Sequence, residues 1–324
     1  MQINSINNYS YKPNFQSNLT QFSKKLDCIL ERNCTTVPVD DLLDLTQSLK
    51  ETKNKINKKK DYILGKGYKG IVLRIDSKYA LKISEFFNKG FKLPFFSENI
   101  SKHLKCYYGE PIATFGDYKV IRNLGKHTPV GIPLLKSDNS LRTECDRYYD
   151  EEFLPLFAKL PQKAFDNIAK DCKILNTLKD ENTGLKYSFD YTNPNNFVIK
   201  NNKIFVVDEL VCSRDQTNTT ADLLKALLNY KELGHQTSSD EKTLPLYREI
   251  YKKIIVASLK ANLPLGLIKN EHAWKHCTNT LCKSTKSHNE VIRNLIDIKH
   301  KNQNKISIEK EINSYLDSIF RKTN

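Results

Sequence analysis

The chain has 324 residues, a formal net charge of +15, and 39% hydrophobic and 10% aromatic residues. This composition is typical of a globular protein and excludes wholesale disorder, and the length suits one or two domains. No stretch approaches the roughly 18 apolar residues of a transmembrane helix, and the N-terminus lacks the pattern of a secretory signal peptide. We therefore expect a soluble cytoplasmic protein that works as a monomer.

The positive charge and the eight cysteines also bear on the class of protein. Basic residues are spread along the chain, so we interpret them as a solvated surface and do not expect nucleic acid as a partner. A functional anionic partner is the alternative, because six lysines gather between residues 50 and 60. The cysteines are scattered, which favours reduced thiols in a cytosol over a disulfide scaffold.

The first two parts of the chain differ in texture. Residues 1–58 are expected to form a flexible leader, rich in Asn, Ser and Gln at its start, and then a short helix over 40–57. Residues 59–125 alternate β-rich runs with turns, which predicts a small five-stranded antiparallel β lobe with one helix near 97–108. Its predicted strands lie at 62–64, 71–75, 79–83, 111–115 and 118–124.

The third part, residues 126–324, is mainly helical in pattern. Apolar residues between 165 and 178 recur at the 3.6-residue period of an amphipathic helix. A β-hairpin is predicted over 196–207, with Asn201-Asn202 as its turn. Further helices are predicted at 219–232, 244–261, 289–300 and 306–321. The expected fold class is α+β, with a small β lobe that leads into a mainly helical lobe.

A glycine-rich segment lies at the start of the β lobe. Residues 64–72 read L-G-K-G-Y-K-G-I-V, which has the form G-x-G-x-x-G-x-V. A strand pattern follows the last glycine, whereas the glycines of a dinucleotide-binding fold open a helix, so we interpret the segment as a hairpin that covers phosphates. Glycines let the backbone approach phosphate oxygens that a Cβ would block. The predicted nucleotide-binding residues here are Gly65, Gly67, Gly70 and Val72.

The next strand carries a lysine among apolar residues. Alternation along the strand turns Ala80 and Lys82 to the same face. Lys82 can there present its charge to the α and β phosphates of a nucleotide, and an ordinary surface lysine is the alternative. Glu98 is the candidate ion-pair partner of Lys82. The alternative for Glu98 is an acidic residue in the first turn of a helix, where the helix dipole favours it.

A second constellation lies around two aspartates. Asn195 follows Asp190 by five positions, and Asp208 follows the predicted hairpin, 18 positions after Asp190. Phosphoryl transfer needs a carboxylate near the incoming hydroxyl and oxygen ligands for Mg²⁺. We predict Asp190 as the catalytic carboxylate and Asp208 as a metal ligand. A polar turn around Pro194, with both acids solvated, is the alternative.

Over about residues 60–230 the chain resembles the protein kinase superfamily, and most of all compact bacterial effector kinases of the OspG and NleH type. The shared features are the glycine loop, the Leu81-Lys82 strand, the segment 106–109 and Asp190 with the asparagines after it. The resemblance implies a bilobal fold, ATP and Mg²⁺ as cofactors, and Ser/Thr phosphorylation of protein substrates by Lys82 and Asp190. In the effector group it also implies delivery into a host cell and a ubiquitin-loaded conjugating enzyme as a partner.

The chain departs from that family in the activation machinery. Phe189 stands where an arginine precedes the catalytic aspartate, and Asp208 is followed by Glu-Leu instead of Phe-Gly. Asp222, 14 positions after Asp208, resembles the aspartate that braces the catalytic loop, so the activation segment is expected to be strongly reduced. For the metal-binding asparagine, spacing from Asp190 favours Asn195, and position after the proline favours Asn196.

Two other functions fit the same residues. A pseudokinase that binds nucleotide or a partner would explain the lost Phe-Gly and the short activation segment. A small-molecule kinase of the aminoglycoside or choline type would share the lobes and the metal-binding acids. The intact Lys82, Asp190 and Asp208 favour an active enzyme, and the lack of a histidine near Asp190 disfavours a small-molecule kinase.

Overall fold

The computed structural model describes residues 23, 24, 27, 63–67, 70–84, 100–115, 118–130, 154–181, 183–212, 214, 218–228, 244–266, 288–301 and 308–319. The chain divides into two compact units, one of residues 1–98 and 111–125 and one of residues 99–110 and 126–324. The architecture is a mixture of small antiparallel sheets and helices. None of the helices in the described ranges combines the length and the apolar composition that crossing a membrane requires.

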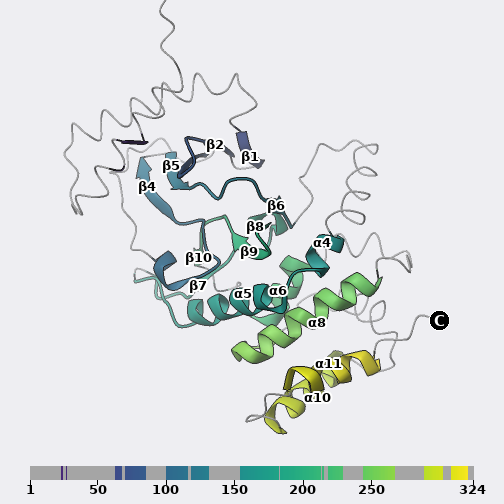
Figure 1. The fold of residues 1–324 in the computed structure, drawn as a ribbon. Coiled ribbons are helices and arrows are strands. Elements are labelled where there is room, and N and C mark those ends of the chain that lie inside the picture. The colour runs from purple at the N-terminus through teal and green to yellow at the C-terminus, as the bar shows by residue number, and fades with distance from the viewer. Residues whose placement is uncertain are drawn as a thin grey trace, which may run out of the picture. The chain divides into compact units, whose positions relative to one another are not determined.

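The first unit contains a five-stranded antiparallel sheet, drawn in Figure 1. Its strands are β1 (Ile63–Gly67), β2 (Gly70–Arg74), β3 (Tyr79–Ser84), β4 (Pro111–Phe115) and β5 (Tyr118–Arg122). They are hydrogen-bonded in the order β1-β2-β3-β5-β4. All five predicted strands are confirmed, with ends that differ by at most three residues.

One face of this sheet is apolar and buried. Leu73, Leu81 and Val120 are aligned across β2, β3 and β5 and are each 0% exposed. Burying a side chain of this size stabilises a fold by about 1.5–3 kcal/mol, so this row alone contributes several kcal/mol. Because side chains alternate along a strand, the neighbouring row turns to the opposite face.

Residues near the N-terminus contact the same unit. Ser23 is helical, only 6% exposed, and donates a hydrogen bond to Asp76. The carboxylate of Asp27 accepts hydrogen bonds from the Tyr79 hydroxyl (2.5 Å) and the Lys78 ammonium (2.9 Å). Polar partners about 50 positions downstream thus hold Ser23 and Asp27, whereas most of the predicted flexible leader lies outside the described residues. The helix predicted over 40–57 lies outside the described residues.

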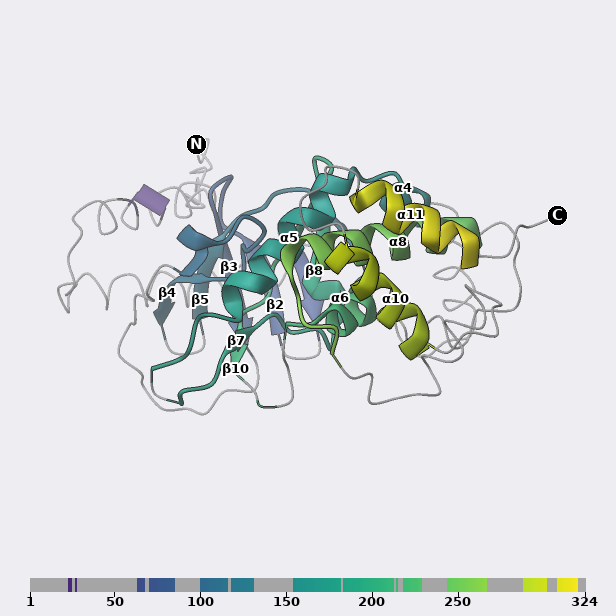
Figure 2. The ribbon, with the colours of Figure 1, turned by 90° about the horizontal axis from the view of Figure 1, so that it is seen from below.

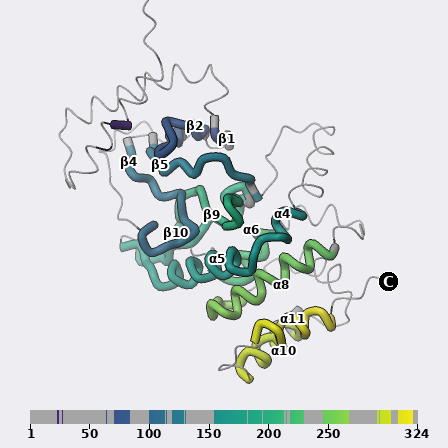
Figure 3. Tube along the Cα trace, viewed as in Figure 1, coloured from purple at the N-terminus to yellow at the C-terminus, as the bar shows by residue number. Residues whose placement is uncertain are grey.

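The second unit is built around helix α8 (Leu244–Ala261). Six consecutive residues, 254–259, are each at most 5% exposed, so this helix is covered on all sides. It contacts four other helices, and Figures 1 and 3 show α5 running beside it. The four are α4 (Leu154–Ala158), α5 (Gln162–Leu175), α6 (Thr220–Leu227) and α11 (Ile308–Ile319). The helices predicted within residues 126–324 are thus confirmed, with α10 (His288–Lys301) as the remaining one.

Charged pairs set how α11 lies along α8. The Lys252 ammonium bonds to Asp317 (2.8 Å), and the Lys260 ammonium, eight residues later, bonds to Glu309 (3.1 Å), eight residues earlier. This register is that of two antiparallel helices. Both carboxylates are substantially exposed, so each pair contributes about 0–1 kcal/mol and specifies the register more than the stability.

Two small sheets complete the second unit. In the larger one, strand β8 (Phe197–Lys200) lies between β6 (Thr128–Pro129) and β9 (Lys203–Val206). The β8–β9 turn is Asn201-Asn202, as predicted, and both residues have the positive φ (49° and 56°) that a tight two-residue hairpin turn requires. In the smaller sheet, β7 (Tyr187–Ser188) pairs with β10 (Val211–Cys212), side by side in Figures 1 and 2.

The helix predicted near 97–108 is wrong for its second half. A single 3-10 turn, η2 (Ile100–His103), is helical, and residues 97–99 lie outside the described residues. Beyond it, the Cys106 carbonyl accepts from the Val206 N–H, and the Tyr108 N–H donates to the Val206 carbonyl, both at 2.7 Å. These long-range bonds take the backbone groups that a helix would need, so tertiary pairing overrides the helical pattern.

Candidate active site

Asp190 lies between two buried aromatic residues. Phe189 and Tyr191 are 0% and 2% exposed, and their rings pack on Phe197 with centroids 6.2 and 5.9 Å away. Because both neighbours turn into the core, Asp190 between them is only half-buried. Its Oδ1 accepts hydrogen bonds from the N–H (2.9 Å) and the hydroxyl (2.5 Å) of Thr192, which orient the carboxylate.

A buried asparagine braces this loop. Asn218 is 0% exposed, and its Oδ1 accepts from the Tyr191 hydroxyl (2.8 Å) and the Phe189 N–H (3.4 Å). Its Nδ2 donates to the Tyr187 carbonyl (2.9 Å) and to Asn176 Oδ1 (3.1 Å). The side chain thus makes all four hydrogen bonds that a carboxamide can form. It holds the residues on both sides of Asp190.

The sequence prediction that Asp222 braces the loop is wrong. In the structure, Asp222 Oδ2 accepts hydrogen bonds from the N–H (3.0 Å) and the hydroxyl (2.8 Å) of Thr219, and the Asp222 N–H bonds back to that hydroxyl. This is a capping box at the start of α6, the usual use of an acidic residue at the third helical position. The brace is Asn218, four residues earlier.

The two candidate asparagines follow in a single 3-10 turn, η4 (Pro194–Asn196). Asn196 is 6% exposed, and its Nδ2 donates to the backbone carbonyl of Asp190 (3.2 Å). Its own carbonyl accepts from the Val207 N–H (2.9 Å). Asn195 is less buried, and its N–H bonds to the side chain of Asn193 (3.1 Å). Asn196 is therefore the residue that connects the Asp190 loop to the chain leading into Asp208.

Asp208 follows strand β9 with one residue between them. Its Oδ1 accepts a hydrogen bond from the N–H of Glu209 (3.0 Å). Two residues further, the N–H of Leu210 donates to the hydroxyl of Tyr107 (3.3 Å) before the chain enters β10. Hydrogen bonds on both sides of Asp208 thus hold the stretch between β9 and β10.

A buried carboxylate anchors the segment that pairs with β9. Asp171 on α5 is 0% exposed and accepts from the N–H groups of Lys105 (3.0 Å) and Cys106 (2.6 Å). Burial raises the pKa of the Asp171 carboxyl, and the two N–H donors oppose that rise. Since the next residues pair with Val206, Asp171 fixes the position of this segment relative to α5.

In the first unit, the predicted nucleotide-binding residues gather on one sheet. Gly65 pairs with Val72, and Val72 pairs with Lys82 on β3, so the three stand in one row across β1, β2 and β3. Ala80, two residues before Lys82, belongs to the same face. Lys82 itself is half-buried, although its strand is central in the sheet.

The remaining predicted residues of this unit are placed only in part. Gly67 pairs with Gly70 and closes the β1–β2 hairpin, as the strand interpretation of the glycine segment predicts. Glu98, the candidate partner of Lys82, lies outside the described residues. Asp190, Asn195, Asn196 and Asp208 come together within the second unit instead.

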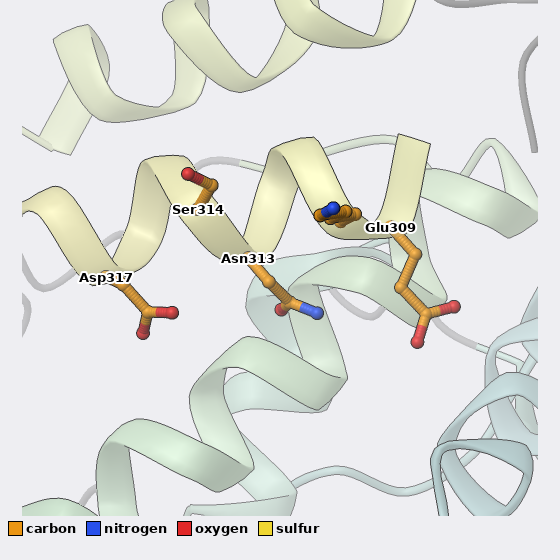
Figure 4. Close-up of a pocket in the computed structure, with 5 residues that line it drawn as sticks. Glu309, Asn313, Ser314 and Asp317 are labelled. Carbon is orange, nitrogen blue, oxygen red and sulfur yellow. The ribbon is translucent and has the colours of Figure 1, made fainter. Parts of the chain in front are cut away.

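The pocket in Figure 4 does not belong to this site. It is lined by Glu309, Lys310, Asn313, Ser314 and Asp317, all on α11. Figure 4 shows Glu309, Asn313 and Asp317 pointing to the same side of the helix. Two of these carboxylates are the partners of the α8 lysines. The pocket is therefore the polar flank of a helix–helix contact.

Comparisons of the chain with protein-family models, with curated proteins and with solved structures each gave no match. Within the described residues, no group of three or more His, Cys, Asp or Glu side chains is arranged to hold a metal ion.

Sequence reasoning missed Asn218 and Asp171, and it named the segment 106–109 only as part of the resemblance, without a role for its residues. Asn218 and Asp171 are polar residues that become fully buried, and no local pattern predicts that. Cys106–Gly109 carried a usable signal, because a lone glycine that ends a predicted helix suggests a close approach of two backbones.

Proposed function

We propose that the chain is an ATP- and Mg²⁺-dependent protein kinase that transfers the γ-phosphate to Ser or Thr hydroxyls of protein substrates. In this proposal the first unit is the nucleotide-binding lobe of a bilobal kinase fold, and the second unit is the catalytic lobe. One observation carries it: Asn196 bonds to the carbonyl of Asp190 and also to the chain that leads into Asp208. A loop, a hairpin and the β7–β10 pair thereby connect the segments that carry the two carboxylates.

Asp190 suits the role of proton acceptor. Its Oδ1 is engaged by Thr192, which orients the carboxylate, and no other residue in the described ranges donates a hydrogen bond to Oδ2. In the proposed reaction this carboxylate takes the proton of the substrate hydroxyl. The hydroxyl oxygen then bonds to the γ-phosphorus while the bond from that phosphorus to the bridging oxygen of ADP breaks.

The donor set on the second unit fits Mg²⁺. Asp208 offers carboxylate oxygen, and Asn196 keeps its amide oxygen because its Nδ2 is used by Asp190. Protein Mg²⁺ sites commonly use one or two carboxylates and complete the shell with substrate phosphates and water, so a set of three protein acids is not required. Bound Mg²⁺ would neutralise charge on the transferring phosphoryl group.

The first unit supports the proposal by the side chains that share one sheet face. Val72, Ala80 and the half-buried Lys82 share this face with Arg74, which is paired with Ala80, and with Lys119, which is paired with Lys82, so it offers apolar side chains beside several cations. The Gly67–Gly70 hairpin offers backbone without Cβ atoms. A cation on a rigid central strand can hold the α and β phosphates while the glycine hairpin covers them.

A pseudokinase that binds nucleotide without transfer, and a small-molecule kinase, stand as alternatives. Asp190 and Asp208 are both held by hydrogen bonds, which favours an active enzyme over a binding module. The ubiquitin-loaded conjugating enzyme and delivery into a host cell follow from the resemblance alone. This partner and this delivery route can be tested once phosphate transfer has been measured.

The test is phosphate transfer from γ-labelled ATP with Mg²⁺ to casein, myelin basic protein and the chain itself. Wild type should label protein, and Lys82→Met, Asp190→Ala and Asp208→Asn should each reduce labelling at least 100-fold, about 2.7 kcal/mol in barrier. Exposed residues of α10 provide matched controls, Lys301→Met and Asp297→Asn, which should keep wild-type rates. Mg²⁺–ATP binding without labelling would favour a pseudokinase, and labelling of aminoglycosides or choline alone would favour a small-molecule kinase.

A further inference from the structure

We infer that Gly109, with Tyr107, forms a clamp that sets the position of the metal-binding Asp208, so that residue 109 must be glycine. The inference rests on the proposed function, because it takes Asp208 as the Mg²⁺ ligand. It adds a positioning residue that does not touch substrate or metal.

Gly109 approaches the backbone of Asp208 more closely than any other residue type could. A Cβ built on Gly109 would lie 2.0 Å from the Asp208 carbonyl oxygen, 2.4 Å from its carbonyl carbon and 2.9 Å from its nitrogen. Ordinary contact begins at 3.4 Å, so a methyl group at this position would force a displacement of about 1.4 Å. The atoms it would meet are backbone, which cannot rotate away as the end of a side chain can.

Contacts on both sides of Gly109 keep that approach from relaxing. Cys106 and Tyr108 exchange backbone hydrogen bonds of 2.7 Å with Val206, two residues before Asp208. The hydroxyl of the buried Tyr107 accepts from the N–H of Leu210 (3.3 Å), two residues after Asp208. The clamp therefore holds the chain before, at and after Asp208.

The clamp has its own fixed support. The carboxylate of Asp171 binds the N–H groups at the start of the segment, Lys105 and Cys106. Since α5 carries Asp171 in the core, a substitution at residue 109 cannot be absorbed by sliding the segment without breaking these bonds. The displacement falls on Asp208, whose carboxylate would move by a distance that commonly reduces turnover by about 100-fold.

The chain offers a matched control for Gly109→Ala. A Cβ built on Gly184 meets nothing within 4 Å, although its φ of +65° makes the substitution mildly strained. Gly184→Ala therefore reports a glycine-to-alanine change with backbone strain but without contact to Asp208. Tyr107→Phe is a second, gentler variant, since it removes only the hydroxyl that Leu210 uses.

The experiment measures Mn²⁺ binding by the disappearance of its free electron paramagnetic resonance signal, with a non-hydrolysable ATP analogue present. Turnover and thermal unfolding are measured on the same full-length preparations. Gly109→Ala should weaken Mn²⁺ binding at least tenfold and reduce turnover about 100-fold at temperatures where it is folded. Tyr107→Phe should weaken Mn²⁺ binding about threefold, and Gly184→Ala should bind as wild type does.

Two results would overturn the clamp while leaving the proposed function intact. One is a folded Gly109→Ala that binds Mn²⁺ and turns over within twofold of wild type. The other, which decides the matter if Gly109→Ala does not fold, is a Tyr107→Phe with unchanged Mn²⁺ affinity. A wild-type chain that neither binds Mn²⁺ with the nucleotide nor transfers phosphate would instead refute the proposed function, and the clamp with it.

Discussion

The side-chain amide nitrogen of Asn196 donates a 3.2 Å hydrogen bond to the backbone carbonyl of Asp190. This bond orients the carboxamide, so that in the proposed site its oxygen is the atom that would bind Mg²⁺. Position after the proline favoured Asn196 for this role, whereas spacing from Asp190 favoured Asn195. The contact gives a structural reason to prefer Asn196.

We therefore expect Asn196→Ala to raise the Mg²⁺ concentration for half-maximal phosphate transfer at least tenfold and to reduce turnover about 10–100-fold. Asn195→Ala, its neighbour in the same 3-10 turn, is the matched control and should stay within threefold of wild type. Steady-state kinetics over a Mg²⁺ titration separates the two. The reverse ranking would return the metal role to Asn195.

A second prediction concerns the brace at Asn218. Asn218→Ala removes the hydrogen bonds that Asn218 makes to the buried Tyr191 hydroxyl and to the Tyr187 carbonyl, which should lower the free energy of unfolding by on the order of 3 kcal/mol. Because the brace holds both sides of Asp190, turnover should fall even well below the melting temperature, with little change in the Michaelis constant for ATP.

Tyr191→Phe removes one of the bonds to Asn218, together with the 3.1 Å contact between the hydroxyl and the Cys172 thiol, and should reproduce a smaller part of both effects. Urea unfolding and kinetics at 15 °C measure the two quantities. A stable Asn218→Ala with wild-type turnover would mean that the loop around Asp190 does not need the brace.

The third prediction is a pH dependence set by Asp171. Burial raises the pKa of this carboxyl above its ordinary value of 3.8. The folded state then binds the proton more tightly than the unfolded state. The contribution of Asp171 to stability is therefore fully present below pH 3.8 and is lost as the pH rises through the folded-state pKa.

Asp171→Asn cannot titrate at this position. The melting temperature of wild type minus that of the variant should therefore increase as the pH falls from 7 to about 4. Thermal unfolding of both proteins across this range gives the difference directly. If this difference in melting temperature decreased on acidification, the N–H groups of Lys105 and Cys106 would outweigh burial and lower the pKa of Asp171 instead.

The fourth prediction is that activity does not depend on phosphorylation of the chain's own loop. Phe189, directly before Asp190, is apolar and 0% exposed, so it cannot bind a phosphate. A phosphate orders a loop by bonding to a cationic side chain, and Phe189 provides none. Treatment with phosphatase should change turnover less than twofold, and a tenfold loss would reveal a phosphate-binding cation elsewhere.

The sequence predicted most elements whose pattern is local. The strands of the first unit and helices α5, α6, α8, α10 and α11 follow from alternation and from the helical period, and the hairpin at Asn201-Asn202 follows from turn chemistry. The segment after η2 was missed because its backbone bonds go to Val206, 100 positions away. The same holds for the site: Asp190 and Asp208 stand out by spacing, whereas Asn218 and Asp171 matter only through burial.

The path of the chain between the two units has a consequence for how the protein is made. Residues 99–110 belong to the second unit, and the chain then returns to the first for β4 and β5. On the ribosome, the sheet can close once residue 122 has emerged, while Cys106 must wait for Val206, which at about 5–20 residues per second takes several seconds more. During that interval the segment that later holds Asp208 is unpaired, a natural target for a chaperone.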